Sequence, residues 1–229
     1  MLRQLNSNFL EECTAFFGGG TLITLLYGEY RLSQDIDFAC PAGSGYRFLR
    51  NQVQKMGCNA LFHNTEDIEI PRPPRTDQYG IRFPVCIEGE LIKFEIFCEA
   101  RIQLGSPSRP SWAPVACLNE IDTFAEKLLA NADRWLDSSV ECRDLIDLCF
   151  MRRTHPMPQE AVQKATDAYD VLPSLHRAIR RFQENPQERH RCFTALEIKD
   201  RPAAIDGLDL LAQDQGFGPT QRAADEQHL

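Results

Sequence analysis

Hydrophobic residues follow two kinds of spacing, alternating along short segments of the first half and recurring at helical intervals in the second. Polar and apolar residues alternate over 35–40, 79–87 and 91–98, which predicts three strands. Gly89 separates the last two segments, as is typical of a hairpin turn. Between the first strand and this hairpin, the apolar residues of 46–56 recur at the intervals of a helix. The first half is therefore expected to form a sheet with helices beside it.

The second half of the chain predicts helices. An apolar stripe runs through 119–136, and similar spacing over 139–151 predicts a second helix. One or two more helices fit within 158–182, and the Pro- and Ser-rich segment 105–114 is typical of a linker. From about Ala212 the chain is polar and short of core residues, which favours a loose tail. We therefore predict an α+β fold whose C-terminal half is α-helical, with domains 1–114 and 115–210 and a polar, flexible tail over 211–229.

The composition is that of an ordinary globular protein, since 43% of the 229 residues are hydrophobic and 25% are charged. A net charge of −8 argues against a protein that coats nucleic acid, because phosphate neutralisation supplies most non-specific affinity. An RNA substrate would need a local basic patch, for which Arg72, Arg75 and 176–181 are candidates, although such residues also balance neighbouring acidic ones. The nine cysteines form no C-x-x-C pair, which favours a reducing compartment. Without an apolar signal core or a membrane-length segment, we predict a cytoplasmic protein.

A glycine turn and a pair of aspartates supply the first candidate chemistry. Three glycines, 18–20, precede an apolar run that predicts a helix beginning at Thr21, and a helix N-terminus favours a phosphate. Asp35 and Asp37 lie two apart on a predicted strand, so their carboxylates point the same way, roughly 6–7 Å apart. Paired carboxylates suit Mg²⁺, which binds a few carboxylates together with substrate phosphates. Taken singly, the glycines also fit a tight turn and the aspartates a solvated strand end.

Glu95 is a candidate for a third carboxylate on a neighbouring strand. Two metal ions about 3.5–4 Å apart would then activate an attacking hydroxyl and stabilise the departing pyrophosphate. The alternative is a surface glutamate that pairs with Lys93, two residues away on the same strand face.

The segment 19–38 resembles the signature of the nucleotidyltransferase superfamily, which has the DNA polymerase β-like fold. It is similar in particular to the AbiEii/AbiGii toxin branch, with a Gly-Gly-Thr/Ser turn, a short helix and then Arg-x-Ser-x-Asp-hydrophobic-Asp-Phe. Two later motifs, 125–128 and 143–148, resemble the lysine helix and the Arg-Asp-x-x-Asp-Leu helix of that family. The resemblance covers roughly 16–150. The matching residues of the first motif are Gly19, Gly20, Thr21, Arg31, Ser33, Asp35, Asp37 and Phe38.

The resemblance implies a mixed β-sheet with helices and an active site for an NTP. By that resemblance, Asp35 and Asp37 hold Mg²⁺ or Mn²⁺, with Glu95 in a position that is often Asp in the superfamily. Lys127 neutralises phosphate charge and counts among the catalytic residues, and Asp144 or Asp147 completes the site. The residues expected to contact the nucleotide are Gly19, Gly20, Thr21, Arg31, Ser33 and Lys127.

The helical motifs also have structural interpretations. Lys127, Asn131 and Arg134 fall on a polar stripe of their helix, which is typical of a solvated face. Arg143 and Asp147 are four apart and would form an ordinary surface pair. Asp144 would alternatively orient Lys127 or a substrate hydroxyl.

Three functions fit the sequence. The first is an active Mg²⁺-dependent nucleotidyltransferase, a toxin or abortive-infection effector that moves NMP from an NTP to a hydroxyl of RNA, such as the tRNA 3′ end, or of a protein. The second is a non-catalytic nucleotide- or RNA-binding module. The third is a small-molecule nucleotidyltransferase of the aminoglycoside type. A cognate antitoxin is implied only by the resemblance, and the sequence does not select the base, the acceptor or the oligomeric state.

Overall fold

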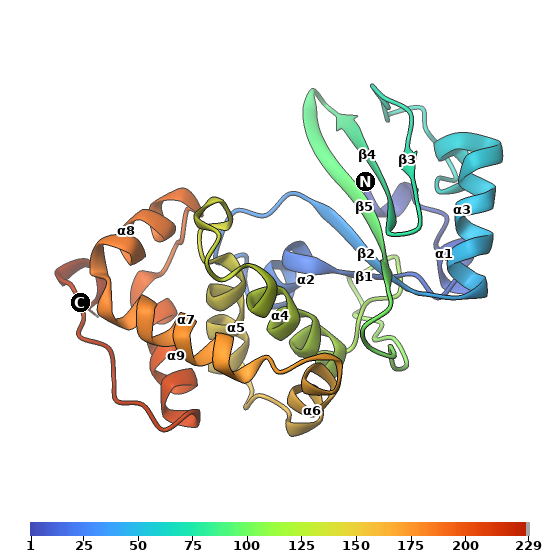
Figure 1. The fold of residues 1–229 in the computed structure, drawn as a ribbon. Helices are drawn as coiled ribbons and strands as arrows, with labels where there is room; N and C mark the ends of the chain where they lie inside the picture. Colours follow the sequence, from blue (N-terminus) through green and yellow to red (C-terminus); the bar gives the residue numbers. More distant parts are fainter. Residues whose placement is uncertain (228–229) are drawn as a thin grey trace. The chain divides into compact units, whose positions relative to one another are not determined.

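The structure is a computed structural model that describes residues 1–227 (Figure 1). The chain forms two compact units. Unit 1 contains 1–22 and 34–120, and unit 2 contains 23–33 and the chain from 121 onward. The chain enters unit 2 within helix α2, Gly19–Leu26. The predicted contiguous domains, 1–114 and 115–210, differ from this division because 23–33 packs with the helical half.

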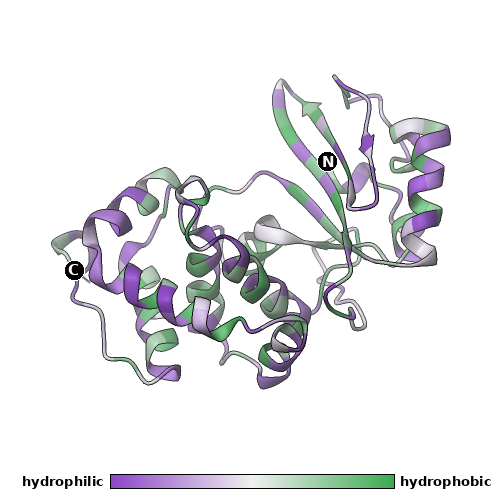
Figure 2. Cartoon of the chain, in the orientation of Figure 1, coloured by the Kyte–Doolittle hydropathy of each residue, from purple (hydrophilic) through white to green (hydrophobic). Residues whose placement is uncertain are grey.

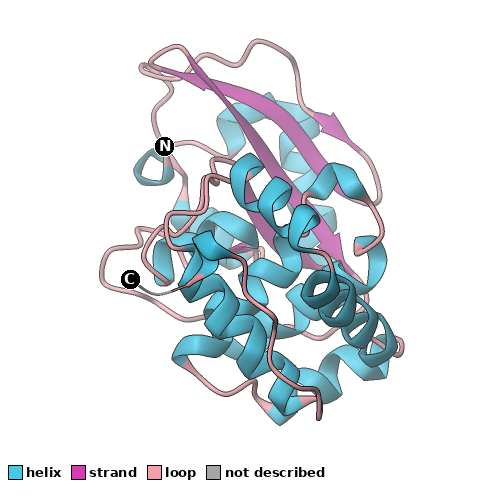
Figure 3. Cartoon of the chain, turned by 90° about the vertical axis from the view of Figure 1, so that its left-hand side faces the viewer, coloured by secondary structure: helices cyan, strands magenta, loops and turns pink. Residues whose placement is uncertain are grey.

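Unit 1 is built on a five-stranded sheet in the order β1-β2-β5-β4-β3. β2 and β5 are parallel, and the other neighbours are antiparallel. The sheet is therefore mixed, and the predicted α+β fold is confirmed (Figure 3). The strands are β1 (Phe16–Gly18), β2 (Ile36–Pro41), β3 (Arg75–Thr76), β4 (Gly80–Ile87) and β5 (Glu90–Glu99).

The three predicted strands are confirmed as β2, β4 and β5. Their polar and apolar residues alternate because one face of each strand contributes to the core. Hydrophilic and hydrophobic positions follow one another along these strands in Figure 2. The rings of Phe38, Phe94 and Phe83 pack in a row across the sheet, with centroids 5.8 Å and 4.8 Å apart. At the hairpin between β4 and β5, Glu88 and Gly89 both have positive φ angles, as a two-residue hairpin turn requires.

Two helices and two 3₁₀ turns complete unit 1. α3 packs against the sheet beside β2 and β3 (Figure 1). Its buried residues are Tyr46, Leu49 and Val53, whereas Phe48, which the spacing placed with them, is 42% exposed and packs its ring edge-on against Phe9. These elements are α1 (Ser7–Glu12), α3 (Ser44–Met56), η1 (Leu2–Gln4) and η2 (Gly57–Ala60).

Unit 2 is helical, as predicted. α5 and α9 pack closely because Gly207 has no Cβ, so the backbone at Cys149 approaches it directly. The predicted helix 139–151 begins later, at Arg143, because Glu141 and Cys142 adopt left-handed φ angles that interrupt the helix. The helices are α4 (Glu120–Arg134), α5 (Arg143–Thr154), α6 (Gln159–Ala168), α7 (Leu172–Glu184), α8 (Pro186–Ala195) and α9 (Arg201–Asp214), with η3 (Ser138–Val140) and η4 (Ala224–Glu226).

The C-terminal segment, for which we predicted a flexible tail, is anchored to unit 2 at Glu226. Its first residues, 211–214, finish α9. The guanidinium of Arg189, which is completely buried, donates to both carboxylate oxygens of Glu226, at 2.7 and 2.8 Å, and to three backbone carbonyls. A polar segment is thus held by a fully bonded arginine rather than by apolar residues. The last residues of the predicted tail, 228–229, lie outside the described residues.

Candidate active site

The glycine turn lies directly against the aspartate pair in unit 1. Gly19 has a φ of +69°, and a Cβ there would lie only 2.5 Å from Oδ2 of Asp37. Gly20 follows it in the first turn of α2. The hydroxyl of Thr21 donates a hydrogen bond to the backbone carbonyl of Asp35. The close approach therefore requires glycine at position 19, and the start of α2 is tied to the start of β2.

Asp35 and Asp37 present two carboxylates at the start of β2. Asp35 directly precedes the strand, and Asp37 is its second residue. Ile36 and Phe38, which alternate with them, are buried in the core, while both aspartates are half-buried. Because side chains alternate along a strand, the two aspartates lie on the face opposite Ile36.

Glu95 is the register partner of Asp37 on the neighbouring parallel strand, so the two residues share a face of the sheet. Its carboxylate accepts from Nε of Arg82 at 2.5 Å and lies 2.6 Å from Nζ of Lys93. Burial raises the pKa of Glu95, but the hydrogen bonds and charges of Lys93 and Arg82 outweigh it and hold that pKa below its usual value. The predicted pair with Lys93 is confirmed, but Glu95 is half-buried and not a surface residue.

The residues at the start of β2 fit a divalent metal by their chemistry. Two carboxylates are hard oxygen ligands, and Mg²⁺ needs only one or two of them when phosphate oxygens complete its shell. The N-terminal turn of α2 beside them offers backbone N–H groups suited to phosphate. Among residues 1–227, no three His, Cys, Asp or Glu side chains gather as a metal site.

In unit 2, the other predicted residues form a buried charge network. Arg31 donates to both oxygens of Asp147, at 2.7 and 2.9 Å, and Lys127 contacts Asp147 at 2.7 Å and Asp144 at 2.9 Å. Arg134 closes the other end with two bonds to Asp144, at 2.6 and 2.9 Å. Arg31, Lys127, Asp144 and Asp147 are all buried. The structure therefore brings these four residues together, and Asp144 does contact Lys127.

The network keeps its charges in the ionised state. Burial raises the pKa of Asp144, but the charges and hydrogen bonds of Lys127 and Arg134 hold it well below its usual range. Burial likewise opposes the effect of Arg31 and Lys127, which together lower the pKa of Asp147. The two carboxylates raise the pKa of Lys127 against the effect of its burial. Each carboxylate is thus already paired with two cations.

The sequence also allowed structural roles for Lys127 on α4 and Asp147 on α5, and the structure tests both. Lys127 is 6% exposed, so the predicted solvated face is wrong for this residue. Asp147 takes Arg31 and Lys127 as its partners instead of the predicted surface pair with Arg143, because it points into the core of unit 2.

The remaining predicted residues lie at the surface or near it. Ser33 is half-buried in the segment between α2 and β2. Arg72 is exposed on the loop before β3, and Arg75, also exposed, is the first residue of β3. On α7, Arg177 and Arg180 place their guanidinium groups over the rings of Trp135 and Phe217, at 5.8 and 4.5 Å from the centroids.

Sequence reasoning missed Tyr30 and Arg82. The hydroxyl of Tyr30 donates to Oδ1 of Asp147 at 2.6 Å, and its ring stacks on Phe150 with centroids 3.7 Å apart. Arg82 neutralises Glu95 across the β4–β5 pair. Only the alternation of β4 could have placed Arg82 opposite Glu95, and no local signal identifies the partner of Tyr30, which lies 117 residues away.

A mixed sheet whose glycine turn meets an Asp-x-Asp strand start, followed by a helical unit, defines the nucleotidyltransferase class of fold. A family model described as the nucleotidyl transferase AbiEii toxin of type IV toxin–antitoxin systems matches residues 1–220. The chain belongs to this family, and it is a nucleotidyltransferase. The resemblance first seen in the motifs of 16–150 thus extends through most of unit 2.

One solved structure agrees with this fold, and a second gives a weaker match. The crystal structure of a candidate nucleotidyltransferase from H. pylori matches with a TM-score of 0.55 and 16% identity, over 90% of this chain and 88% of that one. JHP933 from Helicobacter pylori matches with a TM-score of 0.45 and 17% identity, over 90% of this chain and 85% of that one. No curated protein matches the chain. No helix within residues 1–227 has both the length and the apolar character needed to cross a membrane.

Proposed function

We propose that this chain is a cytoplasmic toxin that uses Mg²⁺ to transfer NMP from an NTP to an acceptor hydroxyl, either on RNA, such as the tRNA 3′ end, or on a protein. In the transfer, the acceptor oxygen forms a bond to the α-phosphorus of the NTP. The bond from that phosphorus to the pyrophosphate oxygen breaks, and the hydroxyl proton passes to solvent. A cognate antitoxin is the partner that the toxin–antitoxin family implies.

The observation that carries this proposal is the contact between Gly19 and the carboxylate of Asp37. Asp35 and Asp37 would hold the metal, which supplies charge to balance the phosphates and to activate the acceptor oxygen. Gly19, Gly20 and Thr21 offer the start of α2 to the triphosphate. Since phosphoryl transfer depends mostly on positioning and electrostatics, a rigid glycine–aspartate contact is what the reaction needs from the protein.

The roles of the unit 2 residues are a separate part of the proposal. Lys127 and Arg31 lie in the buried network, where Asp144 and Asp147 already neutralise them. We propose that this network positions the helices of unit 2, and that Lys127 serves phosphate only by exchanging a carboxylate for it. Ser33 and Arg31 stay predicted nucleotide contacts.

The test is a labelling experiment on the purified protein. Each α-labelled NTP is incubated in turn with Mg²⁺, total bacterial RNA and the wild-type chain or the Asp37→Ala variant. We expect label in RNA or in protein with one or two NTPs, and a loss of about 1000-fold or more in the variant, because several kcal/mol of metal stabilisation disappears. Asp67→Ala, which removes an exposed carboxylate from a loop of the same unit, is the matched control and should retain full activity.

Each other outcome has a definite meaning. Undiminished transfer in Asp37→Ala would refute the site. Calorimetric binding of an NTP without label in RNA or protein would favour the binding module, and transfer to an added aminoglycoside would favour the small-molecule enzyme.

A further inference from the structure

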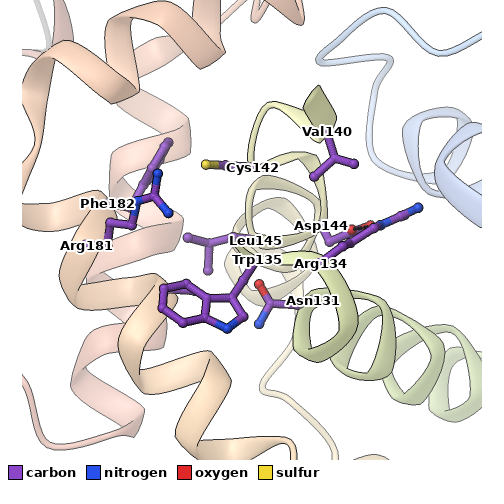
Figure 4. A pocket seen from close by; sticks show the side chains of 10 residues that line it. Asn131, Arg134, Trp135, Val140, Cys142, Asp144, Leu145, Arg181 and Phe182 are labelled. Carbon is purple, nitrogen blue, oxygen red and sulfur yellow. Dashed lines mark hydrogen bonds and ion pairs between the residues drawn. The ribbon is translucent and has the colours of Figure 1, made fainter. Parts of the chain in front are cut away.

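Cys142 differs from the other cysteines in its surroundings. Six of the nine are buried, and only Cys86, Cys98 and Cys142 are partly exposed. Cys142 lies immediately before α5 and lines a small cavity of unit 2 together with Asp144 and Arg181 (Figure 4). In that view its sulfur is directed towards α7, the helix that carries Arg181. Cys142 is therefore the partly exposed cysteine of unit 2.

The turn that carries Cys142 is held against α8 by several contacts. Arg191 of α8 forms an ion pair with Glu141 and lies 3.5 Å from the carbonyl of Ser138. The sulfur of Cys142 lies 3.9 Å from Oε1 of Glu188, which is also on α8. These contacts fix the turn to one face of α8.

A second cysteine lies on that same face. Cys192 is four residues after Glu188 on α8, so the two side chains project to the same side. Its sulfur is 3.7 Å from Nη2 of Arg191, the arginine that binds the Cys142 turn. Cys142 and Cys192 are therefore neighbours, and Cys192 is completely buried.

The charges around the pair favour ionisation at Cys142. The neighbouring Cys192 lowers the pKa of Cys142, with help from Arg181 and Arg191, against the opposing effects of burial and Glu188. The neighbouring Cys142 and burial both raise the pKa of Cys192, so Cys142 is the more readily ionised thiol of the two. By contrast, burial raises the pKa of Cys98, the partly exposed cysteine of unit 1.

The backbone at this turn is strained. Glu141 and Cys142 have φ angles of 52° and 53°, in the left-handed region that residues other than glycine rarely adopt. Two such residues in succession are unfavourable, and they persist only where the surroundings hold them. The contacts to α8 are the ones that hold this turn.

We propose that Cys142 and Cys192 form a peroxide-sensitive dithiol, in which Cys142 is the reactive thiol and Cys192 the resolving one. The Cys142 sulfur attacks a hydroperoxide, the O–O bond breaks, and Cys142 becomes a sulfenic acid while the departing oxygen leaves as water or alcohol. The Cys192 sulfur then bonds to the Cys142 sulfur, and the sulfenic hydroxyl leaves as water with the Cys192 proton. The two thiols are oxidised to a disulfide and the peroxide is reduced.

The disulfide would join α8 to the start of α5, the helix that carries Asp144 and Asp147. Oxidation would thus add a covalent link beside the buried charge network, across the same turn that Arg191 and Glu188 now hold by non-covalent contacts. The modification belongs to unit 2 alone and does not depend on the transferase activity.

The experiment is a peptide map of the reduced, full-length protein after brief treatment with hydrogen peroxide and alkylation of the remaining thiols. Trypsin should release Cys142 in the peptide 135–143 and Cys192 in the peptide 192–199, each with a single cysteine. We expect these two peptides to appear linked, with the loss of two hydrogen atoms, before any other cysteine is modified. In Cys192→Ser, we expect a sulfenic acid at Cys142 that dimedone traps.

Two variants complete the test. Cys142→Ser should give no linked peptide and leave Cys192 as a free thiol, whereas Cys98→Ser, the matched control in unit 1, should form the link as the wild type does. Thermal melts of the reduced variants check that each is folded. The proposal fails if Cys142 is modified no faster than Cys86 and Cys98, or if Cys192 is oxidised equally in Cys142→Ser.

Discussion

The two units hold their carboxylates in opposite ways. At the start of β2, Asp35 and Asp37 are half-exposed and lie beside a glycine turn, so a metal with its phosphates can reach them. In unit 2, Asp144 and Asp147 are buried and each is paired with two cations. The same residue type thus lies in two different environments, which differ in exposure and in the partners of the carboxylate. A family motif alone does not separate a carboxylate that binds a ligand from one that holds helices together.

The strongest test of this difference removes one charge from the buried network. In Asp147→Asn, Arg31 and Lys127 lose the carboxylate that neutralises them inside the core. Breaking a buried pair in this way costs about 3–5 kcal/mol, and we expect that loss in the free energy of unfolding measured by urea titration. Asp214→Asn, which breaks the exposed pair with Arg152, should cost at most about 1 kcal/mol. Equal losses in the two variants would contradict a structural role for the network.

A substitution at Gly19 tests the carboxylates at the start of β2. In Gly19→Ala, the new Cβ collides with the Asp37 carboxylate and the backbone keeps an unfavourable φ of +69°. Gly57→Ala, at φ +63° with nothing within 4 Å of its Cβ, carries only the backbone cost, which is about 1–2 kcal/mol. We expect Gly19→Ala to lose about 1–3 kcal/mol more in urea unfolding, together with most of its transferase activity. If the two variants match in both measurements, the contact with Asp37 is unimportant.

The acid dependence of stability separates the network from ordinary carboxylates. Because the folded-state pKa of Asp144 is held below its usual value, its contribution is fully present above about pH 4 and is lost as the pH falls towards the folded pKa. Between pH ~6 and pH ~3, the wild type should therefore lose about 1 kcal/mol more than Asp144→Asn in urea unfolding. An identical loss in both proteins would show that Lys127 and Arg134 do not stabilise the ionised carboxylate.

Local patterns of the sequence predicted much of the fold. Alternation identified β2, β4 and β5, and the hairpin at Gly89, because each strand buries one face. The start of α5 was wrong because the left-handed residues Glu141 and Cys142 carry no glycine or proline signal. The parallel pairing of β2 with β5 depends on tertiary register, which no local spacing encodes.

The sequence predicted the residues of the candidate site but not all of their partners. The motif of 19–38 identified the glycines and the aspartate pair because those residues act close together in the chain. The sequence could not predict that Arg31 is buried and paired with Asp147. The two residues are 116 positions apart, and burial is a property of the folded unit. For the same reason, the sequence allowed Glu95 to be either a metal ligand or an ion-pair partner.

The smallest expected effect is that of a change at Glu95. This residue shares a face of the sheet with Asp37, but its carboxylate is paired with cations as those of unit 2 are. It is the register partner of Asp37, yet its charge is shared between Arg82 and Lys93. We expect Glu95→Gln to reduce transfer by less than about tenfold, equivalent to about 1.4 kcal/mol, and to leave the Mg²⁺ concentration for half-maximal activity almost unchanged. A loss as large as that of Asp37→Ala, with a higher Mg²⁺ requirement, would make Glu95 a third metal ligand. The ion pairs with Arg82 and Lys93 would then have to open in the working enzyme.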